Sequence, residues 1–291
     1  MENNIRIINE DAYVALDKIE NKTIQTICID PPYNIGKDSW DSWETPEKYT
    51  EWLMSIIIKL ETKLKDNGSF FIFHNDMEQI VEIIQNMKKS TKLKFKQMIV
   101  WNKRFDGCKK RGYLDGFLVI NDAHNWLKMA EYILFFTFDN SEKIIKTRKE
   151  KNIRQTIIGQ EIKSKNGKPT GWYSNIESGK SMPTKENINA ITKHLGLTYD
   201  DIVPKFYNLK THHSVWNYNI AERNEVHITP KPIELLKNII HHTTDEGDLL
   251  LDCFAGSGSL GLACLHTNRK CILIEKNEKY YEYMKNIVNE Q

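Results

Sequence analysis

The chain has 291 residues, of which 40% are hydrophobic and 27% charged, a composition typical of a globular protein with one large domain or two small ones. No apolar run is long enough to cross a membrane, and the polar beginning of the chain is unlike a signal peptide. The five cysteines form no C-x-x-C pair, so we expect reduced core residues of a cytoplasmic protein and assign no metal site.

The net charge of +2 is unevenly distributed along the chain. Residues 1–50 carry ten acidic and five basic side chains, whereas residues 143–168 carry nine basic and two acidic ones. A local positive field in a nearly neutral protein indicates a polyanionic partner on one face. A solvated lysine-rich surface would have the same composition, so both interpretations stay open at this point.

The chain begins with strand and helix patterns in alternation. Residues 5–8 predict an edge strand, and Asp11 can either cap the helix that follows or accept a hydrogen bond from a ligand. Residues 26–29 predict a buried strand because they are apolar and β-rich. Two prolines end this strand, since neither has an N–H to donate to a β-ladder.

The turn after this strand has the residue types needed for chemistry on an amino group. It presents a carboxylate, a free carbonyl and an aromatic ring at the carboxyl end of a strand, where ligands bind in open α/β sheets. The two acceptors can hold both protons of an exocyclic amine, and the ring can stack on a base. An ordinary strand-ending turn is the alternative. The predicted catalytic residues are Asp30, Pro31, Pro32 and Tyr33.

Strands and helices continue to residue 138. Residues 34–47 predict a loop over a site, Pro46 begins an amphipathic helix, and Asn67-Gly68 predicts a turn. Further strands are predicted at residues 69–73, 96–101 and 131–138, with a helix at residues 77–87.

Residues 102–125 interleave basic and aromatic side chains with three glycines. This composition suits contact with a nucleic-acid backbone and stacking on bases, although an exposed loop with chance charge is the alternative. We predict DNA contacts from this stretch, from the loop after the catalytic turn and from the basic segment beyond residue 140. The predicted residues are Lys37, Trp40, Lys103, Arg104, Lys109, Lys110, Arg111, Lys146, Arg148 and Lys149.

Residues 139–205 are predicted to form a separate helical unit. A basic segment leads into three short helices at residues 157–162, 170–178 and 184–195. The stretch 175–197 partly resembles a repressor-type helix-turn-helix, and we expect the unit to contact DNA beside the catalytic crevice. A helical insertion that only packs on the main domain is the alternative.

A second ligand-binding pattern lies near the end of the chain. Residues 248–251 predict a strand, and the glycine-containing residues 252–259 begin an apolar helix, as in nucleotide-binding βα units. The next strand, residues 271–274, ends at Glu275, whose carboxylate can accept from both hydroxyls of a ribose. No lysine follows the glycines, so a P-loop is excluded. S-adenosyl-L-methionine has a ribose and a carboxylate but no phosphate, and is therefore the expected cofactor.

Five stretches in this order resemble the β-class DNA amino-methyltransferases. They are Asp-Pro-Pro-Tyr-Asn at residues 30–34, Trp-Asp at 40–41, Glu-Tyr-Ile-Leu at 131–134, His-Ile-Thr-Pro-Lys-Pro at 227–232 and Asp-Cys-Phe-Ala-Gly-Ser-Gly at 252–258. Ser259 departs from the usual threonine. The resemblance implies an α/β, circularly permuted Rossmann-like fold, with a mixed, mostly parallel sheet and helices on both faces. The catalytic domain would comprise residues 1–138 and 206–291.

The resemblance also implies the reaction. A methyl group would pass from S-adenosylmethionine to the N6 amine of a flipped adenine in double-stranded DNA, in a prokaryotic or phage-encoded restriction–modification enzyme. Aspartate at the first catalytic position favours adenine-N6 over cytosine-N4 transfer. RNA or glutamine methyltransferases and a non-enzymatic helix-turn-helix regulator are weaker alternatives. A homodimer and a restriction endonuclease are further partners that it implies.

Site roles carried over from the family place Asp30 and the Pro31 carbonyl on the amine and Tyr33 on the base. On the cofactor, Phe254 would lie near the methionine part, Glu275 on the ribose, Asp11 on the adenine, and Thr229 and Lys231 at the carboxylate. The full set of predicted cofactor residues is Asp11, Ala12, Asp30, His227, Thr229, Lys231, Asp252, Phe254, Ala255, Gly256, Ser257, Gly258, Glu275 and Lys276.

Overall fold

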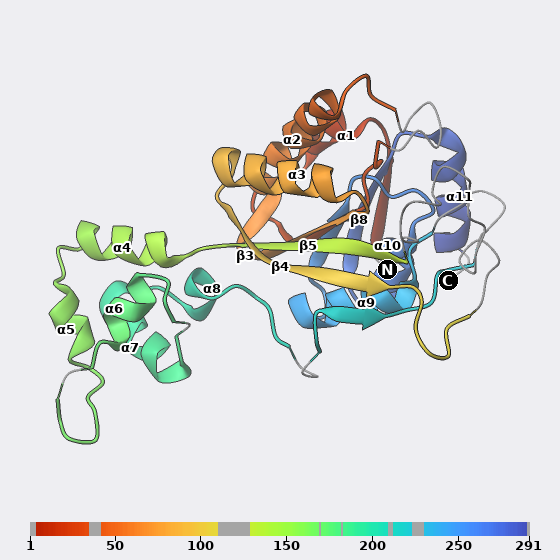
Figure 1. The fold of residues 1–291 in the computed structure, drawn as a ribbon. Helices are drawn as coiled ribbons and strands as arrows, with labels where there is room; N and C mark the ends of the chain where they lie inside the picture. Colours follow the sequence, from red (N-terminus) through yellow and green to blue (C-terminus); the bar gives the residue numbers. More distant parts are fainter. Residues whose placement is uncertain are drawn as a thin grey trace.

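A computed structural model describes residues 4–34, 42–109, 129–168, 170–181, 183–208, 212–222 and 230–289. Within them, an eight-stranded sheet has the order β1-β8-β7-β2-β3-β5-β4-β6 (Figure 1). Every pairing is parallel except those of β5, which is antiparallel to β3 and β4. This confirms the predicted mixed, mostly parallel sheet. The strands are β1 (Ile5–Asn9), β2 (Ile24–Ile29), β3 (Leu64–His74), β4 (Leu93–Asn102), β5 (Ala130–Phe138), β6 (Val215–Asn217), β7 (Leu249–Asp252) and β8 (Lys270–Glu275).

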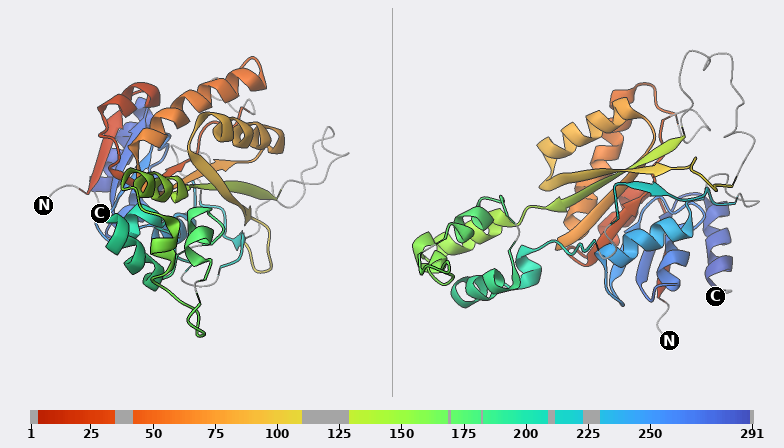
Figure 2. Two further views of the ribbon diagram at one scale, coloured as in Figure 1. Left: turned by 90° about the vertical axis from the view of Figure 1, so that its left-hand side faces the viewer. Right: turned by 60° about the horizontal axis from the view of Figure 1, so that its bottom comes forward.

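Helices cover both faces of the sheet and enclose two hydrophobic cores (Figures 1 and 2). One core lies between the sheet and α1 (Ala12–Ala15), α2 (Pro46–Lys63) and α3 (Met77–Ser90). The other lies between the sheet and α9 (Ile233–Thr243), α10 (Ser259–Leu265) and α11 (Glu278–Asn289). Both layers confirm the predicted fold class. In the described part of the chain, no helix is long and apolar enough to cross a membrane.

Strand β2 lies in the middle of the sheet, between β7 and β3, and all six of its residues are buried. It pairs in parallel with β7, with Thr26 opposite Leu250 and Ile27 opposite Leu251. Parallel neighbours end at the same edge of a sheet, so the turn after β2 and the turn after β7 lie side by side. The sequence predicts that the two turns face the same crevice only if these strands are neighbours in one sheet. The pairing of β2 with β7 shows that they are neighbours.

Two local predictions at β3 and α2 have different outcomes. Helix α2 begins at Pro46 as predicted, with the Thr45 hydroxyl accepting from the Lys48 N–H. The predicted turn at Asn67-Gly68 is wrong, because β3 runs through both residues. Ile24 of β2 pairs with Leu64 of β3, and Thr26 pairs with Ser69. Two residues along β2 therefore correspond to five along β3, and an irregularity in β3 accommodates the three additional residues. A Cβ atom on Gly68 would lie 2.6 Å from the Leu64 side chain, so close packing requires this glycine.

Residues 139–205 contain five helices in the described ranges. The basic segment, which the sequence suggests only as an approach to helices, is itself helix α4. A separate hydrophobic cluster joins these helices, with Ile144, Ile158, Tyr173 and Ile191 among its buried members. The helices are α4 (Ser141–Glu150), α5 (Gln155–Gly159), α6 (Trp172–Glu177), α7 (Lys185–Leu195) and α8 (Tyr199–Ile202). We call this part the helical unit.

The helical unit lies at the edge of the sheet opposite the two turns (Figures 1 and 2). Antiparallel β5 leads away from the turns over nine residues, a span of roughly 30 Å. The unit then contacts the beginning of β3, where the Lys205 N–H donates to the Asn67 carbonyl and the Asn140 amide donates to that of Asp66. The expectation that the unit lies beside the catalytic crevice is therefore wrong, because β5, alone among the described strands, runs in the opposite direction.

Arg148 does not fit its predicted role as a DNA contact. Its guanidinium pairs at 2.5 Å with Glu177, whose side chain is only 4% exposed, and it also donates to the Ile153 carbonyl. Tyr173 donates to the same carboxylate at 3.2 Å. Arg148 therefore holds α4 against α6 inside the helical unit.

We expect Arg148→Met to destabilise the helical unit by about 3 kcal/mol, because it leaves the buried Glu177 carboxylate without its cation. Amide hydrogen exchange in α4, α6 and α7 should accelerate, while exchange in β2 and β7 should not. The matched control is Lys146→Met on the same helix, where the lysine side chain is 78% exposed and the change should be below about 0.5 kcal/mol. Equal exchange in the two variants would contradict a structural role for Arg148.

Candidate active site

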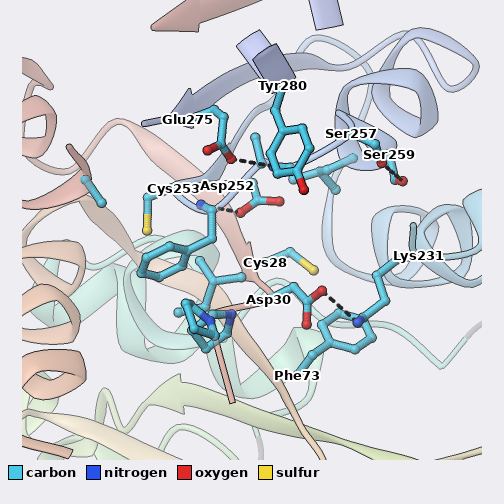
Figure 3. A pocket seen from close by; sticks show the side chains of 18 of the residues that line it. Cys28, Asp30, Phe73, Lys231, Asp252, Cys253, Ser257, Ser259, Glu275 and Tyr280 are labelled. Carbon is cyan, nitrogen blue, oxygen red and sulfur yellow. Dashed lines mark hydrogen bonds and ion pairs between the residues drawn. The ribbon is translucent and has the colours of Figure 1, made fainter. Parts of the chain in front are cut away.

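A cavity of about 570 Å³ opens where β2, β7 and β8 end (Figure 3). Residues of both predicted turns line it, so the structure brings the predicted catalytic residues and the predicted cofactor residues together. The predicted residues that line the cavity are Asp11, Ala12, Asp30, Pro31, Pro32, Tyr33, Lys231, Asp252, Phe254, Ala255, Gly256, Ser257, Glu275 and Lys276.

Asp30 is held from both sides by neighbouring donors. Its Oδ1 accepts from the Tyr33 hydroxyl at 2.5 Å. Its Oδ2 lies 2.6 Å from Lys231 Nζ, and Figure 3 marks this ion pair. Burial raises the pKa of Tyr33, and the charge of Asp30 adds to this, so the hydroxyl keeps the proton that it donates. Burial alone would lower the pKa of Lys231, but Asp30 and Glu131 outweigh it and raise that pKa, so the ammonium stays charged.

Glu131 connects this pair to a second lysine. One carboxylate oxygen lies 3.3 Å from Lys231 Nζ, and the other contacts Lys103 Nζ. Burial acts to raise the pKa of Glu131, but the two ammonium groups outweigh it and hold it at about 2. The sequence analysis assigns no role to Glu131, although this residue begins one of the five stretches that carry the family resemblance. A lone acid at the start of the apolar strand β5 is a second signal that could have found it.

Lys103 and Lys231 have partners that the sequence does not predict. The Lys103 side chain is 17% exposed, and its ammonium lies 4.6 Å from the centre of the Trp101 ring, so it does not fit a surface contact with DNA. The family resemblance places Lys231 at the cofactor carboxylate, but in this structure its ammonium is paired with Asp30 and Glu131.

The glycine turn after β7 is tied to the end of β8. The Gly256 N–H donates to Glu275 Oε2 and the Asn277 N–H to Oε1, each at 2.8 Å. Gly256 and Gly258 have φ of 51° and 78°, in the left-handed region that favours glycine. Gly258 caps α10 and is not among the residues that line the cavity. A Cβ atom at this position would lie 2.8 Å from Met284 Cγ, so the packing of α11 also requires a glycine here.

Asp11 caps α1 and also lines the cavity, so the two roles that its sequence context leaves open are compatible. Its Oδ1 accepts from the Tyr13 N–H at 3.0 Å and caps α1, while Oδ2 lies 3.3 Å from Lys276 Nζ. The residue also lines the cavity. A helix cap can therefore present a carboxylate oxygen to a ligand.

Two tryptophans form a wall of the cavity to which the sequence patterns assign no role. The ring of Trp43 lies 4.7 Å from that of Trp52, and Trp52 lies 5.6 Å from Phe254. The backbone N–H of Trp43 donates to Asn34 Oδ1 at 2.9 Å and positions this residue. These rings offer flat apolar surfaces at the end of the cavity near the glycine turn.

The remaining predicted residues lie apart from the cavity or outside the described part of the chain. Arg104 donates to Cys108 Sγ, and exposed Lys109 pairs with Glu222. All five cysteines are free; Cys108 is half-buried and the other four are buried, so only Cys108 departs from the expected core location. Lys37, Trp40, Lys110, Arg111, His227 and Thr229 lie outside the described residues.

The cavity fits a nucleoside cofactor with a carboxylate. Glu275 lies at the end of β8 as a ribose acceptor would, and the rings of Trp43, Trp52 and Phe254 line the same cavity. Lys276, whose side chain is 77% exposed, supplies a cation there, whereas Lys231 is paired with two carboxylates. Burial raises the pKa of Asp252 to about 8, although the Phe254 N–H that donates to it at 2.9 Å acts in the opposite direction. Burial therefore favours the protonated form of Asp252.

The raised pKa of Asp252 predicts a loss of stability as pH rises. The folded form binds a proton that the unfolded form, with an ordinary pKa near 3.9, releases, so stability falls by roughly 1.4 kcal/mol per pH unit between about pH 5 and 8. Asp252→Asn keeps the acceptor for the Phe254 N–H and removes the titration. Urea unfolding without ligand should show the variant losing less stability than the wild type over this range. If the free energy of unfolding changed with pH equally in the wild type and in Asp252→Asn, the raised pKa of Asp252 would be contradicted.

Comparison with known proteins identifies the family. The DNA methylase family of N6- and N4-methyltransferases matches residues 24–286. Type II methyltransferase M1.MboII of Moraxella bovis is 28% identical over 300 residues, covering 98% of this chain and 96% of that protein. DNA adenine methyltransferase YhdJ of Escherichia coli is 26% identical, covering 94% and 79%. The chain therefore belongs to the N6/N4 DNA methylase family and is an S-adenosylmethionine-dependent DNA methyltransferase.

Solved structures share the fold at low sequence identity. PvuII DNA methyltransferase, described as cytosine-N4-specific, has a TM-score of 0.62 at 14% identity and covers 99% of this chain and 94% of its own. M1.HpyAVI in complex with SAM has a TM-score of 0.58 at 18% identity, covering 98% and 99%. These similarities confirm the fold class and do not distinguish adenine from cytosine.

Proposed function

We propose that this DNA methyltransferase acts on the N6 amine of an adenine that is flipped out of double-stranded DNA. The observation that supports this proposal most is the position of Asp30. It belongs to an Asp-Pro-Pro-Tyr turn and lines the same cavity as the glycine turn. Adenine specificity rests on the aspartate, on the family resemblance and on the similarity to an adenine methyltransferase of Escherichia coli. Cytosine-N4 transfer is the second candidate, because the same acceptors suit either amine.

The proposed chemistry depends on hydrogen-bond acceptors. The lone pair of an adenine amine is delocalised into the ring, so the nitrogen is a weak nucleophile. If Asp30 and the Pro31 carbonyl accept its two protons, the nitrogen can become pyramidal, and the positive charge that develops on it faces the Asp30 carboxylate. Tyr33 would stack on the base and, through its hydroxyl, hold Asp30 in position.

S-adenosylmethionine supplies an activated methyl group when bound, so placing the amine in line with it accounts for much of the rate. We assign Glu275 to the ribose, Asp11 to the adenine, and Phe254 to the methionine part, with Trp43 and Trp52 as additional apolar walls. Relatives named as type II methyltransferases support a role in restriction–modification. The homodimer and the restriction endonuclease stay predictions.

Asp30→Ala should lower methyl transfer by at least roughly a hundredfold, because it removes the acceptor that faces the developing charge. Radiolabelled methyl transfer to DNA, followed by hydrolysis and mass spectrometry of the nucleosides, measures the rate and identifies the methylated base. The control is Asp245→Ala, an aspartate that is 79% exposed and precedes β7 at the opposite edge. Activity of Asp30→Ala within a few-fold of the control would remove Asp30 from the mechanism, and N4-methylcytosine as product would overturn adenine specificity.

The helical unit stays a proposed DNA contact, now at a distance from the cavity. Lys146, Lys149 and Lys151 are exposed on and after α4. Replacing all three with glutamine should flatten the dependence of DNA affinity on salt by about 0.9 in log–log slope for each phosphate that the protein no longer neutralises. The matched control replaces exposed Lys88, Lys89 and Lys92, at the end of α3 and the start of β4. An unchanged slope together with an altered sedimentation coefficient would indicate a protein–protein surface instead.

A further inference from the structure

Both oxygens of the proposed catalytic carboxylate already have partners in this structure. Tyr33 donates to Asp30 Oδ1, and the Lys231 ammonium lies 2.6 Å from Oδ2. The Lys231 side chain is only 10% exposed, so water screens its charge weakly. The following inference rests on the proposed function, in which Asp30 accepts a proton of the target amine.

An ammonium at this position opposes the proposed reaction. Positive charge develops on the amine nitrogen during methyl transfer, and Asp30 lowers the barrier by facing it. Lys231 in contact with the same carboxylate neutralises that effect and places a like charge nearby. Lys231 therefore needs a second anionic partner close enough to accept it when Asp30 turns to the amine.

Glu131 is placed to be that partner. Its Oε2 lies 3.3 Å from Lys231 Nζ, yet this buried oxygen has no aligned hydrogen bond among the described residues. The other oxygen contacts Lys103, whose ammonium also lies over the Trp101 ring. Glu131 is thus fixed on one side by Lys103 and presents its second oxygen to Lys231.

We propose that Glu131 is a positioning residue for methyl transfer, which takes the Lys231 ammonium from Asp30 when the target amine binds. A small movement of one lysine side chain changes the partner of Lys231 while the number of buried charges stays constant. Lys103 keeps Glu131 ionised and oriented throughout, so Lys103 also supports the exchange. The glutamate acts through Lys231 and does not touch the substrate.

The test is a double-mutant cycle on methyl transfer to DNA with Glu131→Gln and Lys231→Met. Glu131→Gln keeps the shape of the side chain but removes its charge, so Lys231 stays on Asp30. We expect kcat to fall about tenfold or more, equivalent to about 1.4 kcal/mol, with KM for the cofactor nearly unchanged. In the Lys231→Met background, the same change should have little further effect, because the lysine that Glu131 controls is absent.

The possible outcomes distinguish a failure of this inference from a failure of the proposed function. Equal effects of Glu131→Gln in both backgrounds would mean that Glu131 only supports the fold, and an unchanged kcat would exclude any positioning role; either overturns the inference. Asp248→Asn is the matched control, because this aspartate is 14% exposed, pairs with Lys205 at 2.6 Å and lies at the opposite edge of the sheet; the change should lower stability and leave kcat unchanged. If the wild type transfers no methyl group to DNA in the same assay, the proposed function itself has failed.

Discussion

The site depends on the parallel pairing of β2 with β7. These strands are more than 200 residues apart in the sequence, yet Thr26 pairs with Leu250 and Ile27 with Leu251. Because both strands are buried and point in the same direction, their final residues, Ile29 and Asp252, bring Asp30 and the glycine turn into one cavity. A shift of one residue in this register would turn buried side chains of β2 to the opposite face and move Asp30 away from the cofactor residues.

Electrostatics adds a second constraint at the same edge. Asp30, Lys231, Glu131 and Lys103 form a chain of alternating charges with 10–25% exposed side chains. Desolvating four charges is costly, and an apolar set of similar volume would often be at least as stable. Their placement beside the cavity is therefore better explained by chemistry than by stability. Burial raises the pKa of the neighbouring Asp252, which disfavours a further negative charge at the site.

Much of the fold could be predicted from local patterns. The strands at residues 26–29 and 271–274 and the helix beginning at Pro46 have the apolar periodicity and punctuation that the structure confirms. The turn predicted at Gly68 was wrong, because the sequence alone does not distinguish a glycine required by packing against Leu64 from a glycine required by a turn. The position of the helical unit could not be predicted, since it follows from the antiparallel direction of β5, which depends on non-local pairing.

Site residues that belong to a motif within one stretch of the chain could be predicted from the sequence. Ion pairs between residues that are far apart in the chain could not. Asp30 and Glu275 line the cavity as expected, but the pairing of Lys231 with Asp30 joins residues 201 positions apart and leaves no local trace. A crystal structure with S-adenosylhomocysteine tests most directly whether one cavity holds the cofactor and the catalytic carboxylate together. We expect the ribose at Glu275 and the sulfur on the side of the cavity that contains Asp30. A ligand bound outside this cavity, or with its sulfur directed away from Asp30, would contradict this arrangement.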